Sequence, residues 1–538
     1  MRISRVVITN HSRIQDLDID IRRHAVIVGA NDVGKSSILR ILNLTLGTST
    51  TGLYQTLTPG DLRDPDKPMV VKVWWTDFTE QNRRSFPDEI SIAEDQETES
   101  LLVQMLVEIH PENVDEITVR RWFPESGHER VPSREQLEEF GWRYLRATRG
   151  SSMIEGAHSP VRALLAAADL GKNEENLKNL LNQFNEELSG DESVIELLNR
   201  VANHLNRAMP RNVSRDDFTV RSVTDPSNDV LQDVSIFLNR DGKQASLLEQ
   251  SDGVRQLMSM TLFDLAEGTA NVLAIDEPEL HLHPTSQRTA ADLLSGEGNQ
   301  KIIVTHSPYI LHRFEPEEVI AVDRHGKCHQ IKPIQFSKIE KVRAHWWSPR
   351  LLEALTSRFV IVVEGDADRV IVEAVAEALG VDLDRLGAVV VELDGAEKFT
   401  NIFPLVGPDG FGPTLLGLVD EKESSKWVNA FGKKPATIVD KKIFISVVDL
   451  EDEYTRAFGG PVSARVLVDS GLCREKGILQ AAKVLKLDDV TPEAVAKVCR
   501  KKKVDAARCI AEALSKETAE KIGSVSRLLH ALEELSVQ

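Results

Sequence analysis

Apolar and polar residues alternate with a changing period along the first half of the chain. Runs at residues 2–9, 16–20 and 25–29 have the length and alternation of strands. The third run ends at a glycine-rich turn, and a helix is expected from Lys35. Leucines at helical spacing over 160–209 predict helices in that stretch. Further strands are expected at residues 69–75, 101–109, 116–123, 234–238, 272–276 and 301–306.

The second half of the chain shows a new alternation of strands and helices. An apolar run begins at Phe359, strand and helix alternate to about residue 455, and a mostly helical tail begins at 475. In the first half, polar stretches at 87–100 and 124–136 predict surface loops. We therefore expect an α/β protein, and its 538 residues are too many for a single hydrophobic core.

Composition and charge narrow the classes of protein. A net charge of −19 argues against a chain that coats nucleic acid through overall charge, although a local basic groove is compatible with it. Four cysteines without CxxC spacing predict neither a zinc knuckle nor a disulfide framework, which fits a reducing, cytoplasmic setting. The start of the chain has a strand pattern where a signal peptide would be apolar, and no long apolar run predicts a membrane span.

Residues 29–36 have the chemistry of a phosphate-binding loop. They form a complete GxxxxGKS motif between an expected strand and an expected helix. The glycines let backbone N–H groups surround phosphate oxygens, and the helix N-terminus adds a positive dipole. Lys35 is expected to neutralise the β- and γ-phosphates, and Ser36 to offer its hydroxyl to Mg²⁺. The ordinary alternative is a chance glycine turn. The predicted ATP-binding residues are Gly29, Asn31, Gly34, Lys35, Ser36 and Ser37.

An apolar strand at 272–276 ends in two carboxylates. We expect Asp276 to reach the Mg²⁺ ion and Glu277 to polarise the attacking water as a general base. Paired acids at the end of a buried strand are costly unless a cation compensates them. His306 follows a later strand and is expected near the γ-phosphate. Alone it would be a structural histidine, but the order lysine, acid pair, histidine favours an ATPase.

The stretch DEPELHLHP at 276–284 resembles the ABC ATPases of the SMC and RecF type. In that group a signature motif of one subunit completes the ATP site of the other, which implies a homodimer or higher homo-oligomer. The matching stretch is a degenerate SDGVRQ, and the resemblance places Ser251 and Gly253 at the nucleotide. Ser251 also fits an ordinary helix N-cap, and both roles are compatible. For the glutamine of the family's Q-loop, Gln55 is only a weak candidate.

Carboxylates also follow strands of the second half. Glu364 ends one apolar strand, Asp368 lies on the first turn of the next helix, and Asp420 ends a later strand. Glu451 follows a third strand. Such an oxygen-rich cluster suits Mg²⁺ or Mn²⁺, and two ions would stabilise the attacking and leaving oxygens of a phosphodiester displacement. Each acid alone fits a solvated strand end equally well, so the prediction depends on the set.

A glutamate-glycine pair at one strand end and an aspartate at a later one resemble the Toprim fold of topoisomerases, primases and recombination nucleases. An ABC ATPase followed by Toprim resembles the OLD (overcoming lysogenisation defect) family, to which many phage-defence nucleases belong. The resemblance implies an ABC-type ATPase domain with a helical dimerisation insert, followed by a C-terminal Toprim domain with a helical tail. The implied ranges are 1–335 for the ATPase domain, 150–215 for its insert, 336–358 for a helical connector and 359–538 for the Toprim domain.

One lysine of the chain matches the family and another departs from it. The family uses a lysine in its C-terminal helical part to assist cleavage, and Lys503 matches it, although a solvated basic helix face is an equal alternative. Toprim domains usually carry DxD at the second acidic strand, whereas this chain has Lys422 two residues after Asp420. Glu421 or Glu423 substitutes for the missing acid, or Lys422 replaces the charge of one metal, or one metal site is lost.

Two classes of function remain after these observations. The first is an ATP-regulated DNA endonuclease or nickase that uses Mg²⁺ or Mn²⁺ in phage defence or DNA processing. The alternative is an ATP-switched DNA sensor or scaffold whose Toprim domain is inactive or depends on a partner, and Lys422 keeps it open. The expected partners are DNA, further copies of the chain and an accessory defence or helicase protein, with no membrane. A topoisomerase is disfavoured because no tyrosine lies in a recognisable breakage module.

Overall fold

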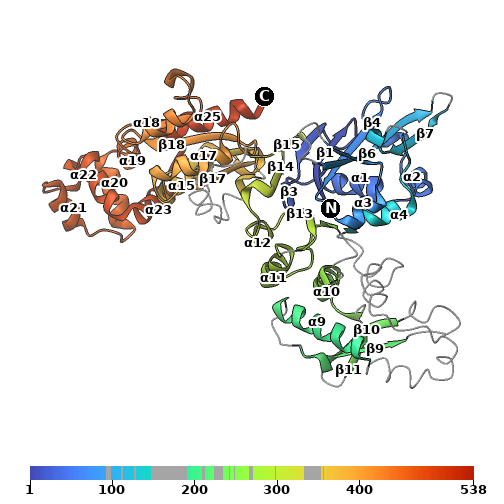
Figure 1. The fold of residues 1–538 in the computed structure, drawn as a ribbon. Helices are drawn as coiled ribbons and strands as arrows, with labels where there is room; N and C mark the ends of the chain where they lie inside the picture. Colours follow the sequence, from blue (N-terminus) through green and yellow to red (C-terminus); the bar gives the residue numbers. More distant parts are fainter. Residues whose placement is uncertain are drawn as a thin grey trace, which may run out of the picture. The chain divides into compact units, whose positions relative to one another are not determined.

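The computed structural model divides into two compact units, Met1–Cys328 and His329–Gln538, which are described separately (Figure 1). Most of the predicted insert at 150–215 and of the predicted connector at 336–358 lies outside the described residues. The structure describes the whole chain except residues 93–98, 111–112, 127–128, 147–190, 209–212, 223–233, 241–242, 247–248, 266–270, 297, 332–352, 356 and 538.

The first unit begins with an antiparallel sheet in the order β2-β1-β4-β6-β5, with β7 beside β6. Its strands alternate between the two faces, and in β4 the side chains of Met69, Val71, Val73 and Trp75 are fully buried. Such alternation is expected where one face packs on a core. The strands are β1 (Arg2–Thr9), β2 (Leu17–Asp20), β4 (Met69–Thr76), β5 (Ile90–Ile92), β6 (Glu99–His110) and β7 (Asn113–Trp122).

Two stretches that the sequence predicts as loops contain short regular elements. Strand β5 lies within 87–100 and pairs with β6. Helix α4 (Arg134–Glu139) begins within 124–136, where the side chains of Ser133 and Gln136 each accept a hydrogen bond from the other's backbone N–H. This capping box satisfies two amides at the helix start and favours a short helix in a polar sequence. The loop prediction is therefore wrong for these two elements.

A second sheet has the order β15-β14-β3-β13-β12-β8, with the two-residue β15 (Cys328–His329) at one edge. The strands from β14 to β8 are parallel. Every residue of β3, β12, β13 and β14 is buried, as their largely apolar sequences require. Because the strands are parallel, their carboxyl ends meet at one edge, where ligands bind in open α/β sheets. The strands are β3 (Ala25–Gly29), β8 (Trp142–Leu145), β12 (Val272–Asp276), β13 (Gln300–Val304) and β14 (Val319–Val322).

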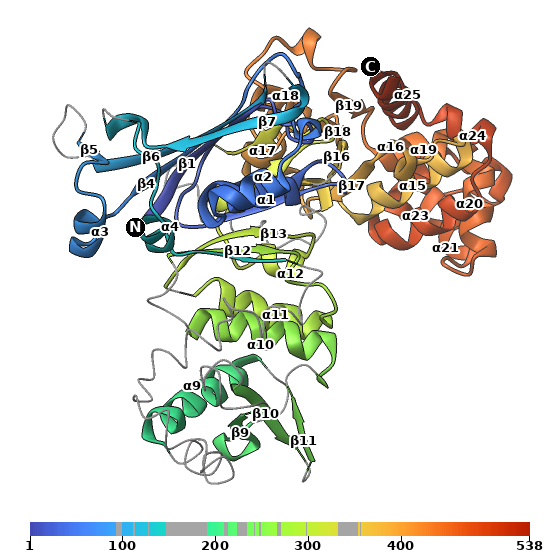
Figure 2. The same cartoon turned by 90° about the vertical axis from the view of Figure 1, so that its right-hand side faces the viewer.

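Helix α1 (Lys35–Gly47) lies between these two sheets (Figure 2). Its buried side chains belong to one hydrophobic core with Trp75 of the first sheet and Val272 of the second. The buried Arg121 of β7 donates to the carbonyl oxygen of Thr48, just beyond the last turn of α1, at 2.7 Å. A cation at a helix C-terminus is stabilising, so α1 is fixed at the end opposite its phosphate-binding turn.

Helix α9 (Glu192–Ala208) is the described part of the stretch predicted as helical. Its residues Leu197, Leu198, Val201 and Leu205 are buried, and it packs against α10 and α11. A small antiparallel sheet follows in the order β11-β10-β9, of which the sequence predicts only the central strand. The elements are α10 (Asp252–Leu265), α11 (Pro284–Leu294), α12 (Pro308–Leu311), β9 (Phe218–Ser222), β10 (Val234–Arg240) and β11 (Lys243–Ser246).

The second unit is built on a parallel sheet in the order β17-β16-β18-β19. Helix α15 (Asp366–Leu379) packs against α23, so the helical tail shares one core with the sheet. The strands are β16 (Phe359–Val363), β17 (Ala388–Glu392), β18 (Thr414–Asp420) and β19 (Ile443–Ser446). The tail contains α19 (Leu450–Phe458), α20 (Gly460–Asp469), α21 (Glu475–Ala482), α22 (Pro492–Cys499), α23 (Lys503–Glu512), α24 (Lys516–Lys521) and α25 (Gly523–Val537).

Candidate nucleotide and metal sites

The GxxxxGKS motif forms a tight turn between β3 and α1. Gly34 has φ 91°, and a side chain there would collide with the carbonyl oxygen of Arg13, so this position requires glycine. Lys35 Nζ donates to the carbonyl oxygen of Ala30 at 2.5 Å, which folds the lysine back over the turn. Burial lowers the pKa of Lys35, although the nearby Glu277 acts in the opposite direction.

This turn opens into a hollow of about 650 Å³, a volume suited to a nucleotide. Gly29 lies at the end of β3, where a side chain would collide with the carbonyl oxygen of Val322. Gly29 and Asp276 are outside the described lining of the hollow. The predicted residues that do line it are Asn31, Gly34, Lys35, Ser36, Ser37, Glu277 and His306. Residues that the sequence analysis did not single out complete the lining, among them Ser12, Arg13, Gln15, Arg63, Arg324 and His325.

Asp276, at the end of β12, meets the start of α1. Ser36 Oγ donates to Asp276 Oδ1 at 2.9 Å, and the Tyr144 side chain lies beside Asp276. Burial raises the pKa of Asp276, and the neighbouring Glu277 adds to this effect. A serine hydroxyl beside a carboxylate is the pair that binds Mg²⁺ in P-loop ATPases, so these donors fit the ion. Tyr144 was missed because β8 joins β12 only in the folded sheet.

A half-buried carboxylate, Glu279, links the acidic strand to the predicted histidine. Glu279 accepts hydrogen bonds from Thr305 Oγ1 at 2.8 Å and from the His306 backbone N–H at 2.5 Å. Burial raises the pKa of Glu279, and burial together with Lys35 lowers the pKa of His306. Glu277 has a positive φ of 49°, and its N–H donates to the carbonyl of the adjacent strand β13. Glu279 belongs to the DEPE sequence but had no predicted role.

The predicted signature residues lie at the start of α10, and the described lining of the hollow includes neither of them. Ser251 is exposed, and its carbonyl oxygen accepts a hydrogen bond from the Arg255 N–H. A side chain at Gly253 would lie 2.7 Å from the carbonyl oxygen of His281, so glycine allows the two backbones to approach. The weak Q-loop candidate Gln55 is exposed on α2 (Thr50–Thr56) and also lies outside the described lining.

The second unit brings the predicted metal-binding acids to one edge of its sheet. Glu364 directly follows β16, and Asp420 ends the neighbouring parallel strand β18. Glu364 Oε1 accepts from the Asp420 N–H at 2.7 Å, while Asp368 Oδ2 accepts from the Gly365 N–H at 2.9 Å. Glu451 is almost fully buried on the first turn of α19.

These carboxylates disfavour each other's ionisation. Burial, followed by Glu364 and Asp368, raises the pKa of Asp420 to about 8. Burial, followed by Glu364 and Glu451, raises the pKa of Asp368 to about 7. Burial also raises the pKa of Glu364. A divalent cation would relieve this repulsion, and the oxygen-only donor set suits Mg²⁺ or Mn²⁺.

The acids are close together but are not arranged around one point. Within the described parts of the chain, no group of three or more His, Cys, Asp or Glu side chains is positioned to bind a metal ion. Glu364 and Asp368 each direct one oxygen toward a backbone N–H, which leaves the second oxygen of each carboxylate for a cation.

Lys503 lies beside this cluster, with Nζ 3.7 Å from Glu451 Oε1. Burial opposes its charge, but Glu451 and the other acids prevail and raise the pKa of Lys503. Arg500, three residues earlier, donates two hydrogen bonds to Asp449 at 2.6 and 2.9 Å. Cations of the helical tail thus border the acidic edge.

The residues after Asp420 have partners of their own. Glu423 Oε2 pairs with Lys426 Nζ at 2.6 Å, and Glu421 Oε2 accepts from the Val448 N–H at 3.3 Å. Lys422 is exposed. Neither glutamate is therefore free to replace the missing acid without losing a bond.

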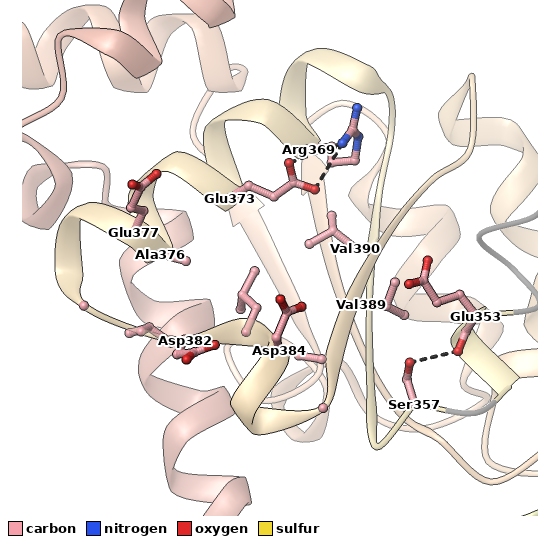
Figure 3. Close-up of a pocket in the computed structure, with 15 residues that line it drawn as sticks. Glu353, Ser357, Arg369, Glu373, Ala376, Glu377, Asp382, Asp384, Val389 and Val390 are labelled. Atoms are coloured by element: carbon pink, nitrogen blue, oxygen red, sulfur yellow. Dashed lines mark hydrogen bonds and ion pairs between the residues drawn. The ribbon is translucent and has the colours of Figure 1, made fainter. Parts of the chain in front are cut away.

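A larger hollow of about 900 Å³ lies beside β17 and α15 (Figure 3). It is lined by Arg369 and by several acids, and its described lining includes no predicted site residue. Arg369 and Glu373 pair across one helical turn at its rim. Its acidic wall is unsuited to a phosphate backbone. The acids are Glu353, Glu373, Glu377, Asp382 and Asp384.

Comparison with known proteins covers both units. A family model described as "AAA domain, putative AbiEii toxin, Type IV TA system" matches residues 25–312, more than half of the chain. A second model, described as "Overcoming lysogenization defect protein-like, TOPRIM domain", matches residues 355–420. Endonuclease GajA of Bacillus cereus (strain VD045) is 22% identical over 176 residues. That match covers 30% of this chain and 30% of GajA, less than a third of the relative's length.

Solved structures give weaker likenesses. An Smc head bound to the C-winged helix domain of ScpA has a TM-score of 0.42 and 17% identity, covering 63% of this chain and 99% of that one. The C-terminal region of the Burkholderia pseudomallei OLD protein has a TM-score of 0.28 and 24% identity, covering 34% of this chain and 98% of that one.

A phosphate-binding loop on one parallel sheet and an acidic edge on a second define a P-loop ATPase joined to a TOPRIM domain. The chain belongs to the AAA domain family that it matches over most of its first unit and, with its TOPRIM domain, to the OLD family. The predicted family and the predicted α/β fold are confirmed. Domains of these two kinds use a nucleotide and a divalent metal. None of the helices that the structure describes has the length and apolar character needed to span a bilayer.

Proposed function

We propose that the protein is an ATP-regulated DNA endonuclease or nickase that uses Mg²⁺ or Mn²⁺ in phage defence or DNA processing. The observation that carries this proposal is the meeting of Glu364, Asp368 and Asp420 at one sheet edge, with pKa values raised by burial and by each other. The similarity to a protein named as an endonuclease supports it.

In the nucleotide site, Lys35 neutralises the β- and γ-phosphates. Ser36 and Asp276, already hydrogen-bonded to each other, would hold Mg²⁺. Glu277, at the rim of the hollow, accepts a proton from the attacking water, and His306 contacts the γ-phosphate. Gly29, Asn31, Gly34 and Ser37 supply backbone and hydroxyl groups to the phosphates.

In the TOPRIM site, Glu364, Asp368, Asp420 and Glu451 would hold one or two divalent ions. When bound, such ions stabilise the negative charge that develops on the oxygens of the cleaved phosphodiester. Lys503 lies where it can neutralise a phosphate oxygen next to the acids. Its mobile ammonium is suited to this task because it acts as a point charge.

We further propose that the chain forms a homodimer or higher oligomer. Ser251 and Gly253 lie outside the described lining of their own nucleotide hollow, which fits a role at the site of a second copy. The helical stretch within 150–215 is the proposed dimer support. A cytoplasmic location, with DNA and an accessory defence or helicase protein as partners, completes the proposal. We take 1–335, 336–358 and 359–538 as its domains.

The alternative is an ATP-switched DNA sensor or scaffold. It is favoured by Lys422 in place of the usual acid and by carboxylates that bind backbone amides in the described structure. In this alternative the nucleotide site functions, while the acidic edge binds DNA or a partner without cleaving.

Nicking of supercoiled plasmid by the full chain, with Mg²⁺ or Mn²⁺ and with or without ATP, tests the proposal. We expect wild type to nick DNA and ATP to change the rate. Lys35→Ala should nick DNA but lose its response to ATP, because the main counter-charge of the phosphates is gone. Lys67→Ala, at an exposed lysine, is the matched control. An absence of nicking on several DNA forms, with ATP binding intact, would favour the sensor.

A further inference from the structure

The turn that follows β14 forms one wall of the nucleotide hollow. Val322, the last residue of β14, pairs with Gly29 at the start of the phosphate-binding loop, and the two strands are parallel. The turn therefore leaves the sheet at the same edge as that loop. Its residues Arg324 and His325 line the hollow together with the phosphate-binding residues.

The backbone of this turn is held firmly in place. Asp323 Oδ1 accepts hydrogen bonds from the N–H groups of His325 at 2.8 Å and Lys327 at 3.0 Å. Gly326 has φ 78°, and a side chain there would lie 3.5 Å from the carbonyl oxygen of Val33 in the phosphate-binding loop. The turn thus packs on the loop itself at ordinary van der Waals distance, and the positive φ is what favours glycine at this position.

The order of strands decides which part of a nucleotide this turn faces. In the sheet, β14 flanks β3 on one side, while β13 and β12 flank it on the other. His306 and Glu277 follow β13 and β12, so the γ-phosphate end of the site lies on their side. The turn with Arg324 and His325 lies on the opposite side, where the ribose and base of a bound nucleotide would extend.

The chemistry of this side is unusual for a base-binding site. Among the described residues that line the hollow there is no Phe, Tyr or Trp on which a base could stack. A guanidinium is planar, is weakly hydrated and stacks on aromatic rings. Arg324 Nε donates to His325 Nε2 at 2.9 Å, which orients the guanidinium next to the imidazole. Both groups are exposed to an incoming ligand.

We infer that Arg324 and His325 bind the purine base and ribose of the nucleotide, with the Arg324 guanidinium stacked on the base. This inference rests on the proposed ATP site and names residues that determine its specificity. The nucleotide site then has two parts. Lys35 and Ser36 hold the triphosphate, and the turn after β14 recognises the nucleoside.

Calorimetric titration of the full chain with Mg²⁺ and three ligands tests the inference. ATP and ADP carry the nucleoside, whereas inorganic tripolyphosphate carries only the phosphates. We expect Arg324→Ala to weaken ATP and ADP binding about tenfold, the effect of one desolvated cation–π contact, and to leave tripolyphosphate binding unchanged. The Arg324→Lys variant should bind ATP and ADP nearly as weakly as Arg324→Ala does, because lysine keeps the positive charge but lacks the planar group that stacks on a base. Arg134→Ala, at a highly exposed arginine of α4, is the control and should change nothing.

The other outcomes are distinct. If Arg324→Ala weakened the binding of tripolyphosphate as much as the binding of ATP, the arginine would contact the phosphates and the inference would be overturned. Unchanged ATP binding, or full rescue by Arg324→Lys, would also overturn it. Wild type that binds no ATP would overturn the proposed ATP site itself, and Lys35→Ala measured in parallel shows whether the observed binding uses that site.

Discussion

Crowded carboxylates at the edge of the second sheet should destabilise the protein in the absence of metal. The pKa of Asp420 is about 8 in the folded protein, against an ordinary value of 3.8. Stability contributed by its protonated form is complete below pH 3.8 and is lost as pH rises through 8. Asp420→Asn replaces the acid by a neutral group of the same size and should remove this cost.

The magnitude follows from the raised pKa. A displacement of about four pH units corresponds to about 5 kcal/mol of unfolding free energy at pH 8. The buried amide of asparagine costs about 1–3 kcal/mol, so a net gain of about 2–4 kcal/mol is expected. For a unit of this size, the melting temperature should rise by about 5–15 °C at pH 8. At pH 4, where Asp420 is already protonated in the folded protein, nothing offsets the cost of the buried amide, and the melting temperature should fall.

Thermal unfolding of the full chain in EDTA, followed at pH 4 and pH 8, measures this effect. Mg²⁺ should stabilise wild type at pH 8 and have little effect on Asp420→Asn, because part of the cation site is gone. Asp384→Asn, at an exposed acid of the same unit, serves as the control. An unchanged or lower melting temperature for Asp420→Asn at pH 8 in EDTA would refute the electrostatic account of the acidic edge.

Three further substitutions address single residues. Glu277→Gln should keep ATP binding but slow phosphate release at least about 100-fold, and wild-type turnover would exclude Glu277 as the base. Glu279→Ala removes the acceptor of the hydrogen bonds from Thr305 and His306, so kcat should fall while the ATP affinity stays within about twofold. Glu279→Gln should restore part of kcat. Loss of ATP binding by Glu279→Ala would contradict a positioning role. Lys422→Asp restores the usual acid pair and should leave plasmid nicking intact or raise it, whereas abolished nicking would mean that the lysine is required.

Much of the site could be predicted because fully buried parallel strands have distinctive sequences. The runs that end at Gly29, Asp276 and Asp420 are apolar, and the chemistry of a parallel sheet collects at its carboxyl edge. Glu364 and Asp368 could be predicted from neighbouring residues alone, because one follows an apolar strand and the other lies on the first turn of the next helix.

Other parts depend on pairings between distant segments. Tyr144 reaches Asp276 because β8 joins β12, more than a hundred residues later in the chain. Arg324 enters the hollow because β14 lies beside β3. Short strands such as β5 have too few residues for a period to be recognised. By contrast, the capping box of Ser133 and Gln136 is a local sequence feature that predicts a helix start. The stretch was predicted as a loop because its composition is polar.

Cleavage at the acidic edge is the central claim, and one comparison of two glutamates tests it most directly. Glu364 lies among the acids at the sheet edge, whereas Glu373 lies on α15 and pairs with Arg369 beside the separate hollow. The rate of plasmid nicking under saturating Mg²⁺ or Mn²⁺ should fall at least about 100-fold for Glu364→Ala and stay near wild type for Glu373→Ala. Equal nicking by wild type and Glu364→Ala would contradict the account, because the cleavage would then come from another site.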